Sequence, residues 1–154
     1  MSTSNELAAL FSRDLNRLRK QIDSFRTDDD LWKILPGVTN PAGNLALHLE
    51  GNLREFVGRQ LGQLSYERKR DLEFSTKGLT QDEVSTRLEE LNQTIPAIIE
   101  SLTKEELESD YPQVVLDSTM TTQQFLFHLY GHLNWHLGQL DYLRRILESK
   151  PNDD

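Results

Sequence analysis

The stretch "FLFHLYGHLNWHLGQL", residues 125–140, carries three of the four histidines in the chain at steps of four: His128, His132 and His136. Apolar residues recur around them at three- and four-residue steps, which is the period of an amphipathic helix. Thr121 followed by Gln124 is a helix-start signal. The pattern predicts one long helix, from about residue 121 to about residue 148, with a histidine on each of three successive turns.

Two of these histidines share the apolar side of the predicted helix. At about 100° per residue, the leucines fall in one sector, which must face the protein interior. His132 and His136 lie inside or beside that sector, and His128 lies at its margin. A buried imidazole without partners costs about 1–3 kcal/mol, and one divalent metal can satisfy two imidazoles four residues apart. Two interpretations stay open: a metal site, or core histidines bonded to carbonyls and water.

Helical periods continue outside this stretch. One helix is predicted over about residues 4–27, and a second over about 41–62, where Asn40 and Pro41 form a start signal. Capping-box spacing predicts a third helix from Thr80 and a short segment from Thr103. Together with the histidine helix, these elements predict an all-α four-helix bundle with short additional helical segments.

The length of the chain predicts one domain over residues 1–154. Its ends, residues 1–3 and 149–154, are expected to be flexible tails, because both are polar and lie outside the helical patterns.

Composition and charge exclude several classes of protein. A net charge of −8 argues against a nucleic-acid partner, since phosphate binding needs clustered lysine and arginine. No apolar run approaches the ~18 residues that a membrane span needs, and the first residues lack the pattern of a secretory signal. Without cysteine there is no disulfide, thiolate ligand or cysteine nucleophile. These features favour a cytoplasmic protein that contacts neither nucleic acid nor membrane.

The remaining histidine, His48, lies in "NPAGNLALHLEGNLREF" on the second predicted helix. Three histidines with an open fourth position are typical of a catalytic zinc site. On the helical wheel, however, His48 lies roughly 100° from the centre of the leucine face, in a strip with Asn52 and Glu55. The period alone therefore predicts an exposed His48, or one on the wall of a polar cleft.

Such a site could activate a water or a thiol. Leu133 follows His132, so this is not a His-Glu-x-x-His peptidase, and the absence of a Glu-x-x-His pair argues against a di-iron bundle. Three glutamates are candidate general bases, although each is expected to be a solvated helix residue: Glu50, Glu55 and Glu73. Three amides could fix imidazole tautomers: Asn44, Asn52 and Gln139. Trp135 and Tyr142 are expected to pack between helices or in a dimer.

Three stretches resemble a known family. "HLYGHLNWHLGQLDYLRRIL" is similar to the C-terminal signature of the DinB/YfiT-like superfamily, in which a His-x-x-x-His-x-Gly-Gln pattern closes the domain. "GNLALHLEGNLREFVGRQLG" resembles the second helix of that superfamily, and "RKRDLEF" resembles an Arg-Asp-x-Glu-Phe stretch of some branches. The likeness spans most of the chain. It implies an up-down-down-up bundle, commonly a homodimer, with a divalent metal on three histidines.

The resemblance also implies a set of site residues. The metal ligands would be His48, His132 and His136, with His128 outside the motif as a rim group. The residues expected beside the site are Gln139, Asn52 and Glu55. Zinc or nickel is the expected metal. Some relatives are thiol-dependent transferases or isomerases that use a low-molecular-weight thiol, and others are described as metal-dependent hydrolases.

Three hypotheses follow for the function. The first is an enzyme that uses a metal on three histidines to activate a thiol or a water toward a small-molecule substrate. The alternative is a non-catalytic homodimeric bundle that binds a metal or a small ligand, and the third is a structural homodimer with vestigial histidines. Metal content separates the third from the others, and turnover with thiols and electrophiles separates the first from the second.

Overall fold

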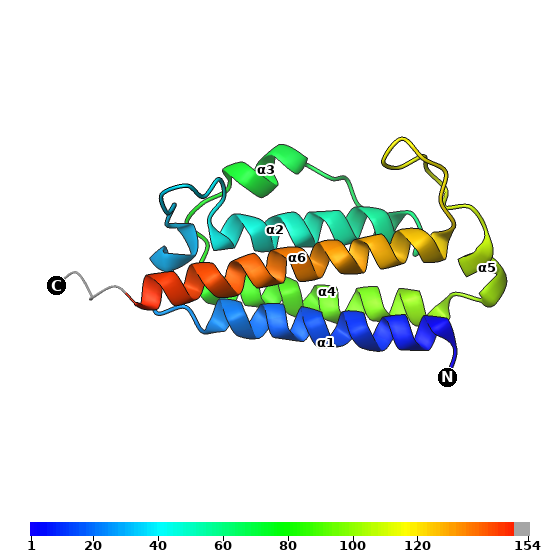
Figure 1. Ribbon diagram of the computed structural model, residues 1–154, viewed down its shortest axis with the longest axis horizontal. Helices are drawn as coiled ribbons and strands as arrows, with labels where there is room; N and C mark the ends of the chain where they lie inside the picture. The colour runs from blue at the N-terminus through cyan, green and yellow to red at the C-terminus, as the bar shows by residue number, and fades with distance from the viewer. Residues whose placement is uncertain (150–154) are drawn as a thin grey trace.

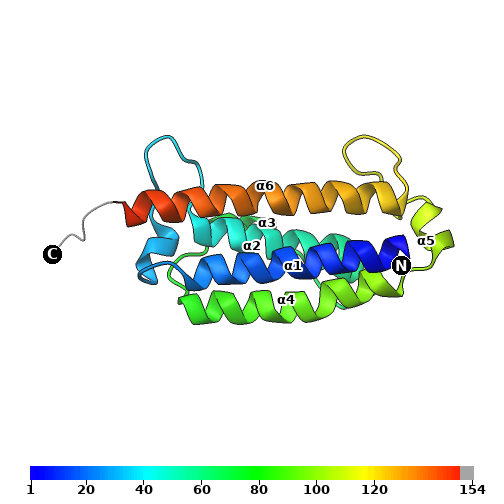
Figure 2. The same ribbon diagram turned by 60° about the horizontal axis from the view of Figure 1, so that its bottom comes forward.

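A computed structural model describes residues 1–149, in which four long helices run along the molecule (Figure 1). They are α1 (Thr3–Asp23), α2 (Ala42–Leu53), α4 (Gln81–Ser101) and α6 (Thr122–Glu148). Helices α1 and α6 run in one direction, and α2 and α4 run in the other (Figures 1 and 2). The predicted up-down-down-up four-helix bundle is therefore confirmed.

Four shorter elements complete the described chain: η1 (Asp29–Trp32), η2 (Arg54–Arg59), α3 (Arg70–Ser75) and α5 (Lys104–Glu108). The element η2 is a π-helical turn that directly continues α2. Helix α3 lies outside α2, as a cover over a bundle helix (Figure 1). No helix in residues 1–149 is long and apolar enough to cross a membrane.

The helix starts follow the capping signals of the sequence. Thr80 accepts a hydrogen bond from the backbone N–H of Glu83, and the Glu83 side chain accepts one from the Thr80 N–H, so the capping box is complete. Thr103 begins α5 with the same arrangement. Thr121 caps α6 through the N–H of Gln124. Each cap satisfies N–H groups that have no partner inside the helix.

Other boundaries differ from the prediction. Helix α1 ends at Asp23 rather than near residue 27, because the Ser24 N–H closes the last turn; Phe25 is still buried, which is why its period looked helical. Pro41, not Asn40, occupies the N-cap of α2. At the N-terminus Thr3 is already helical, capped by Ser2. Of the predicted C-terminal tail, residues 150–154 lie outside the described part of the chain.

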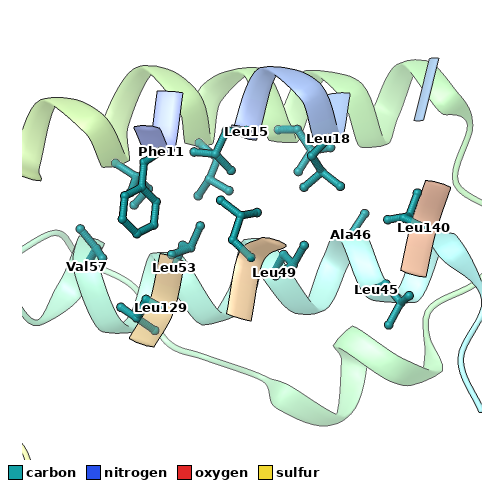
Figure 3. Close-up of a cluster of buried hydrophobic side chains, with 14 of the residues drawn as sticks. Phe11, Leu15, Leu18, Leu45, Ala46, Leu49, Leu53, Val57, Leu129 and Leu140 are labelled. Carbon is teal, nitrogen blue, oxygen red and sulfur yellow. The ribbon is translucent and has the colours of Figure 1, made fainter. Parts of the chain in front are cut away.

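The core runs along the bundle axis. Leu15 and Leu18 of α1 face Leu49 and Leu53 of α2, and Leu129 of α6 closes the cluster (Figure 3). All five are essentially inaccessible to solvent, and each such side chain contributes about 1.5–3 kcal/mol relative to an exposed one. The apolar face predicted for α1 is confirmed as buried.

A buried carboxylate ties α1 to α6. Asp14 is fully buried and accepts hydrogen bonds from Arg13 and Arg17 of its own helix and from the hydroxyl of Tyr130 on α6, at 2.6 Å. Burial alone raises the pKa of Asp14, but hydrogen bonds from Arg13, Tyr130 and Asn134 outweigh it and lower that pKa to about 2.

We expect this carboxylate to make stability depend on pH below pH 5. Because the folded-state pKa of Asp14 is depressed, its contribution is present above the unfolded value of 3.8 and is lost as the pH falls toward 2. The loss amounts to roughly 2 kcal/mol in the free energy of unfolding. Urea unfolding between pH 5 and pH 2 should show a shallower decline in Asp14→Asn than in the wild type. Equal slopes in the two proteins would contradict this assignment.

Candidate metal centre

Three histidines from two helices meet at one point. The Nε2 atom of His132 lies 3.2 Å from Nε2 of His48 and 3.2 Å from Nε2 of His136. One nitrogen from each ring lies within 4.8 Å of the others, an arrangement that could hold a metal ion. His132 and His136 meet because four residues make about one turn of α6, and His48 reaches them from α2.

His48 is buried, with 8% of its surface exposed, so of the two predicted positions the exposed one is wrong, and the position on the wall of a cavity agrees with the structure. The helical-wheel argument requires that the strip of α2 with His48 faces solvent. Instead α3 covers that face, and nearly every residue from Ala42 to Leu53 is buried. Asn44 holds the cover in place by donating hydrogen bonds of 2.9 Å to the carbonyls of Glu73 and Thr76.

Glu73 of α3 orients His48. The Nδ1–H of His48 donates to Oε1 of Glu73 at 3.0 Å, and Arg68 donates to both oxygens of the same carboxylate at 2.9 Å. Burial alone raises the pKa of Glu73, but the hydrogen bonds from His48 and Arg68 outweigh it and hold that pKa below its usual value. Glu73 is therefore an ionised, buried group rather than the solvated residue that the sequence suggested. Arg68 and Glu73 thus form an ion pair.

Gln139 orients His136 in the same way. The Nδ1–H of His136 donates to Oε1 of Gln139 at 2.7 Å, three residues further along α6. The expectation that Gln139 fixes an imidazole tautomer agrees with this contact.

The Nε2 lone pairs of the two oriented rings, His48 and His136, both point toward His132. Glu73 and Gln139 offer acceptor oxygens, so the protons of neutral His48 and His136 reside on Nδ1, and their Nε2 atoms are bare. Both bare atoms face Nε2 of His132, which can donate one proton at most. The buried Nδ1 of His132 has no hydrogen-bond partner in the part of the chain that the structure describes. A cation at the centre would satisfy all three Nε2 atoms.

The surroundings favour neutral His132 and His136, and the neutral imidazole is the metal-binding form. Burial, together with the neighbouring His136 and His48, lowers the pKa of His132 to about 4. Burial also lowers the pKa of His136, although Gln139 opposes that shift. The spacing is suitable as well, since nitrogens that share a tetrahedral zinc at about 2.05 Å lie ~3.3 Å apart.

The other predicted site residues lie around this cluster rather than in it. His128 is exposed and stacks on Phe125, with ring centroids 5.8 Å apart. Asn52 is buried, and its Oδ1 has no partner among residues 1–149. Glu55 is buried too, but it binds Arg59 at 2.9 Å and not a histidine. Hydrogen bonds from Arg59 lower the pKa of Glu55 against the effect of burial. Glu50 pairs with Arg54.

A cavity of about 520 Å³ opens beside the cluster. His48 and His132 contribute to its wall, and so do Asn52 and His128. Residues 113–116, in the segment that joins α5 to α6, also line it. A small molecule in this cavity would therefore lie against two of the three histidines.

Gly51 is required for the contact between Glu73 and His48. A Cβ atom at position 51 would lie 1.9 Å from Oε2 of Glu73, and this carboxylate cannot swing away without leaving His48 and Arg68. We expect Gly51→Ala to weaken zinc binding by about 10- to 100-fold, the usual cost of losing such an outer partner. Competition with a chromogenic chelator measures this affinity. Gly58→Ala is the matched control, because its Cβ would meet nothing closer than 3.8 Å.

Two residues beside the histidines, Glu73 and Arg68, could not be assigned to the site from helical periodicity. Glu73 and Arg68 lie 25 and 20 residues beyond His48, and only the tertiary position of α3 brings them to it. The "RKRDLEF" stretch was the one signal in the sequence that marked both residues.

Comparisons with known proteins agree with this fold. A family model described as "Protein of unknown function (DUF1572)" matches residues 3–152. A crystal structure of a DinB-like protein from Bacillus cereus ATCC 10987 matches with a TM-score of 0.70 and 19% sequence identity, over 92% of this chain and 91% of that one. At this identity the likeness concerns the fold alone, which is DinB-like. No curated protein matches the chain.

Proposed function

Because this chain belongs to the DUF1572 family of proteins of unknown function and has a DinB-like fold, we propose a function centred on its three histidines. His48, His132 and His136 bind one divalent metal, zinc or nickel, through Nε2. The protein then activates a thiol or a water for transfer to, or hydrolysis of, a small-molecule substrate.

The convergence of three Nε2 atoms supports this proposal most directly. Two of them are bare because Glu73 and Gln139 bind the opposite nitrogens, and His132 has at most one proton to share between them. Three imidazole ligands leave a fourth position open, as in catalytic rather than structural zinc sites. A divalent ion held there supplies Lewis acidity, which lowers the pKa of a bound water or thiol.

The residues of the chain then have distinct tasks. Glu73 and Gln139 hold two rings in the metal-binding orientation. No aspartate or glutamate lines the cavity in the described part of the chain, so no carboxylate is placed there as a general base. His128 is the side chain outside the triad that can accept a proton in the cavity. A thiol needs less help from a base than water does, so these surroundings favour thiol transfer over hydrolysis.

Turnover by the metal-loaded protein tests the proposal. Zinc- and nickel-loaded wild type is incubated with electrophiles in the presence and absence of low-molecular-weight thiols, and separately with ester and amide substrates. We expect thiol-dependent turnover that disappears in His132→Ala and after chelation. Stoichiometric metal without any turnover would favour the alternative, a non-catalytic metal-binding bundle. A protein that binds no metal would overturn both.

A further inference from the structure

The cavity beside the triad has an unusual charge for this protein. The chain contains 25 acidic residues and 17 lysines and arginines, yet no acidic side chain lines the cavity and two arginines do. By contrast, the cavity on the other side of α2 is lined by several glutamates, Glu50 and Glu90 among them. Since the field inside a cleft is set by the charges on its walls, this cavity favours an anion.

Of the two arginines, Arg70 is the one that carries net charge. Arg68 is neutralised by its two hydrogen bonds to Glu73. Arg70 is exposed at the start of α3 and makes no ion pair in residues 1–149; its guanidinium lies 5.1 Å from the centroid of Phe74, which in turn lies 5.0 Å from the ring of His48. The ring holds the guanidinium near the triad without consuming its charge.

Much of the remaining wall of the cavity is apolar. Phe56 and Phe125 form one wall, with ring centroids 5.2 Å apart at an interplanar angle of 88°. Val114 and Leu116 also line the cavity, and both are exposed in the protein alone. Leu116 has a φ of 54°, a left-handed conformation that is costly for leucine.

We propose that this cavity binds a small organic anion, with its carboxylate at Arg70 and its apolar body between Phe56, Phe125 and Leu116. The inference rests on the proposed function, because the bound molecule is then the substrate that reaches the triad. It adds the chemical class of that substrate.

Calorimetric titration with a matched pair of probes tests the inference. Phenylacetate and its neutral isostere phenylacetamide are titrated into metal-free and zinc-loaded protein. Three proteins are compared: the wild type, Arg70→Gln and Lys69→Gln. Lys69 is the matched control, because it is the adjacent exposed cation but lines the other cavity. We expect phenylacetate to bind the wild type and Lys69→Gln alike, and to bind Arg70→Gln at least tenfold more weakly. Phenylacetamide should bind all three at least tenfold more weakly than phenylacetate binds the wild type.

The controls separate this inference from the proposed function. Equal affinity for acid and amide, equal affinity of the two variants for phenylacetate, or no binding to the wild type would each overturn the anion site. Zinc content measured on the same samples remains an independent test of the triad. Arg70-dependent binding in a protein that takes up no zinc would support the anion site and overturn the metal proposal.

A different observation concerns the outer face of α6. Gly131 and Gly138 are exposed, and a Cβ at either position would meet nothing within 4 Å. Each glycine weakens the helix, and no contact within residues 1–149 explains either one. Trp135 and Tyr142, on the same side, are 69% and 70% exposed. The expectation that they pack between helices of the same chain is therefore wrong.

The order of residues along this face is symmetric about the midpoint between Asn134 and Trp135. Gly131 and Gly138 lie at equal distances on either side of this midpoint. Phe127 and Tyr142 form a second such pair. Gln124 and Arg145 also lie equally far from it on its two sides. These six residues and Trp135 fall within roughly 80° of the helix. A two-fold interface requires that residue i of one copy meets residue j of the other and the reverse.

We infer that the partner at this face is a second copy of the chain, with the two α6 helices antiparallel. Gly131 of one protomer then lies opposite Gly138 of the other, where the missing side chains allow the helices to approach closely. Phe127 packs on the partner's Tyr142. Trp135 lies next to the two-fold axis. The predicted homodimer thereby receives a defined interface.

Sedimentation equilibrium of Gly131→Gln, Gly138→Gln and Ala9→Gln tests this interface. Glutamine at either glycine position should raise the melting temperature of the protomer by a few degrees, because it is a better helix former. We also expect it to weaken dimerisation at least 100-fold, because its side chain separates the helices. Ala9 is an exposed residue of α1, and Ala9→Gln should dimerise like the wild type. A monomeric wild type, or glycine variants that dimerise as tightly as the wild type, would overturn the inference.

Discussion

Replacing His132 by alanine is expected to abolish stoichiometric zinc binding. His132 is the central member of the triad, because its Nε2 lies 3.2 Å from the Nε2 atoms of both other histidines. Its removal leaves two imidazoles, which is fewer ligands than zinc sites in proteins use. We expect the affinity for zinc to fall at least ~100-fold, more than the loss of an outer partner costs. Elemental analysis of untagged protein, followed by chelator competition, measures both content and affinity.

Replacements of the other three histidines supply the comparison and the control. His136→Ala and His48→Ala should lose the metal as His132→Ala does. His128→Ala removes an identical ring one turn away, and it should retain the metal, because His128 stacks on Phe125 outside the cluster. Zinc retained by His132→Ala, or lost by His128→Ala, would show that the ligand set is different.

Zinc is expected to raise the melting temperature of the wild type by about 10 °C. A ligand that binds only the folded state at 1,000 times its Kd adds about 4 kcal/mol, and for a chain of this size 1 kcal/mol corresponds to about 2–4 °C. Scanning calorimetry at pH 7.5, with and without excess zinc, measures the shift. His132→Ala should show none of it, whereas His128→Ala should show all of it.

The zinc effect should weaken as the pH falls. The folded-state pKa of His132 is lowered to about 4, so the unfolded chain takes up a proton there first, near pH 6.5. The stabilisation by neutral His132 is therefore complete above pH 6.5 and is lost as the pH falls toward 4. Protons also compete with zinc for the same nitrogens. Because that competition sets in at His132 only near its folded-state pKa of about 4, a zinc shift at pH 3.5 as large as that at pH 7.5 would contradict binding by imidazole.

Much of the fold could be predicted because its signals are local. Three helix starts were predicted from capping residues and their neighbours in the sequence, and all three caps are present: Thr80, Thr103 and Thr121. The end predicted for α1 was wrong, because a residue beyond the helix is buried by tertiary packing. Phe25 continues the period of α1 after the helix has ended, because its side chain enters the core from the turn.

In the candidate site, too, some residues could be placed from local spacing and others only from tertiary packing. His132, His136 and Gln139 lie on one helix, so their spacing alone places them together. The burial of His48 depends on α3, a six-residue helix too short to produce a period of its own. Periodicity on α2 could therefore not distinguish a ring under α3 from a ring in water. The burial of Glu73 was missed for the same reason.

Helix α6 is unbroken over 27 residues, from Thr122 to Glu148, which restricts how its sequence can change over evolution. Its inner side fills the core with Leu133 and Leu140, and a neighbouring strip carries His132 and His136. One inserted or deleted residue would rotate everything beyond it by about 100° and turn leucines outward and polar side chains inward. Lineages that retain the bundle should therefore vary this helix by substitution, and should confine changes of length to the segments that join the helices.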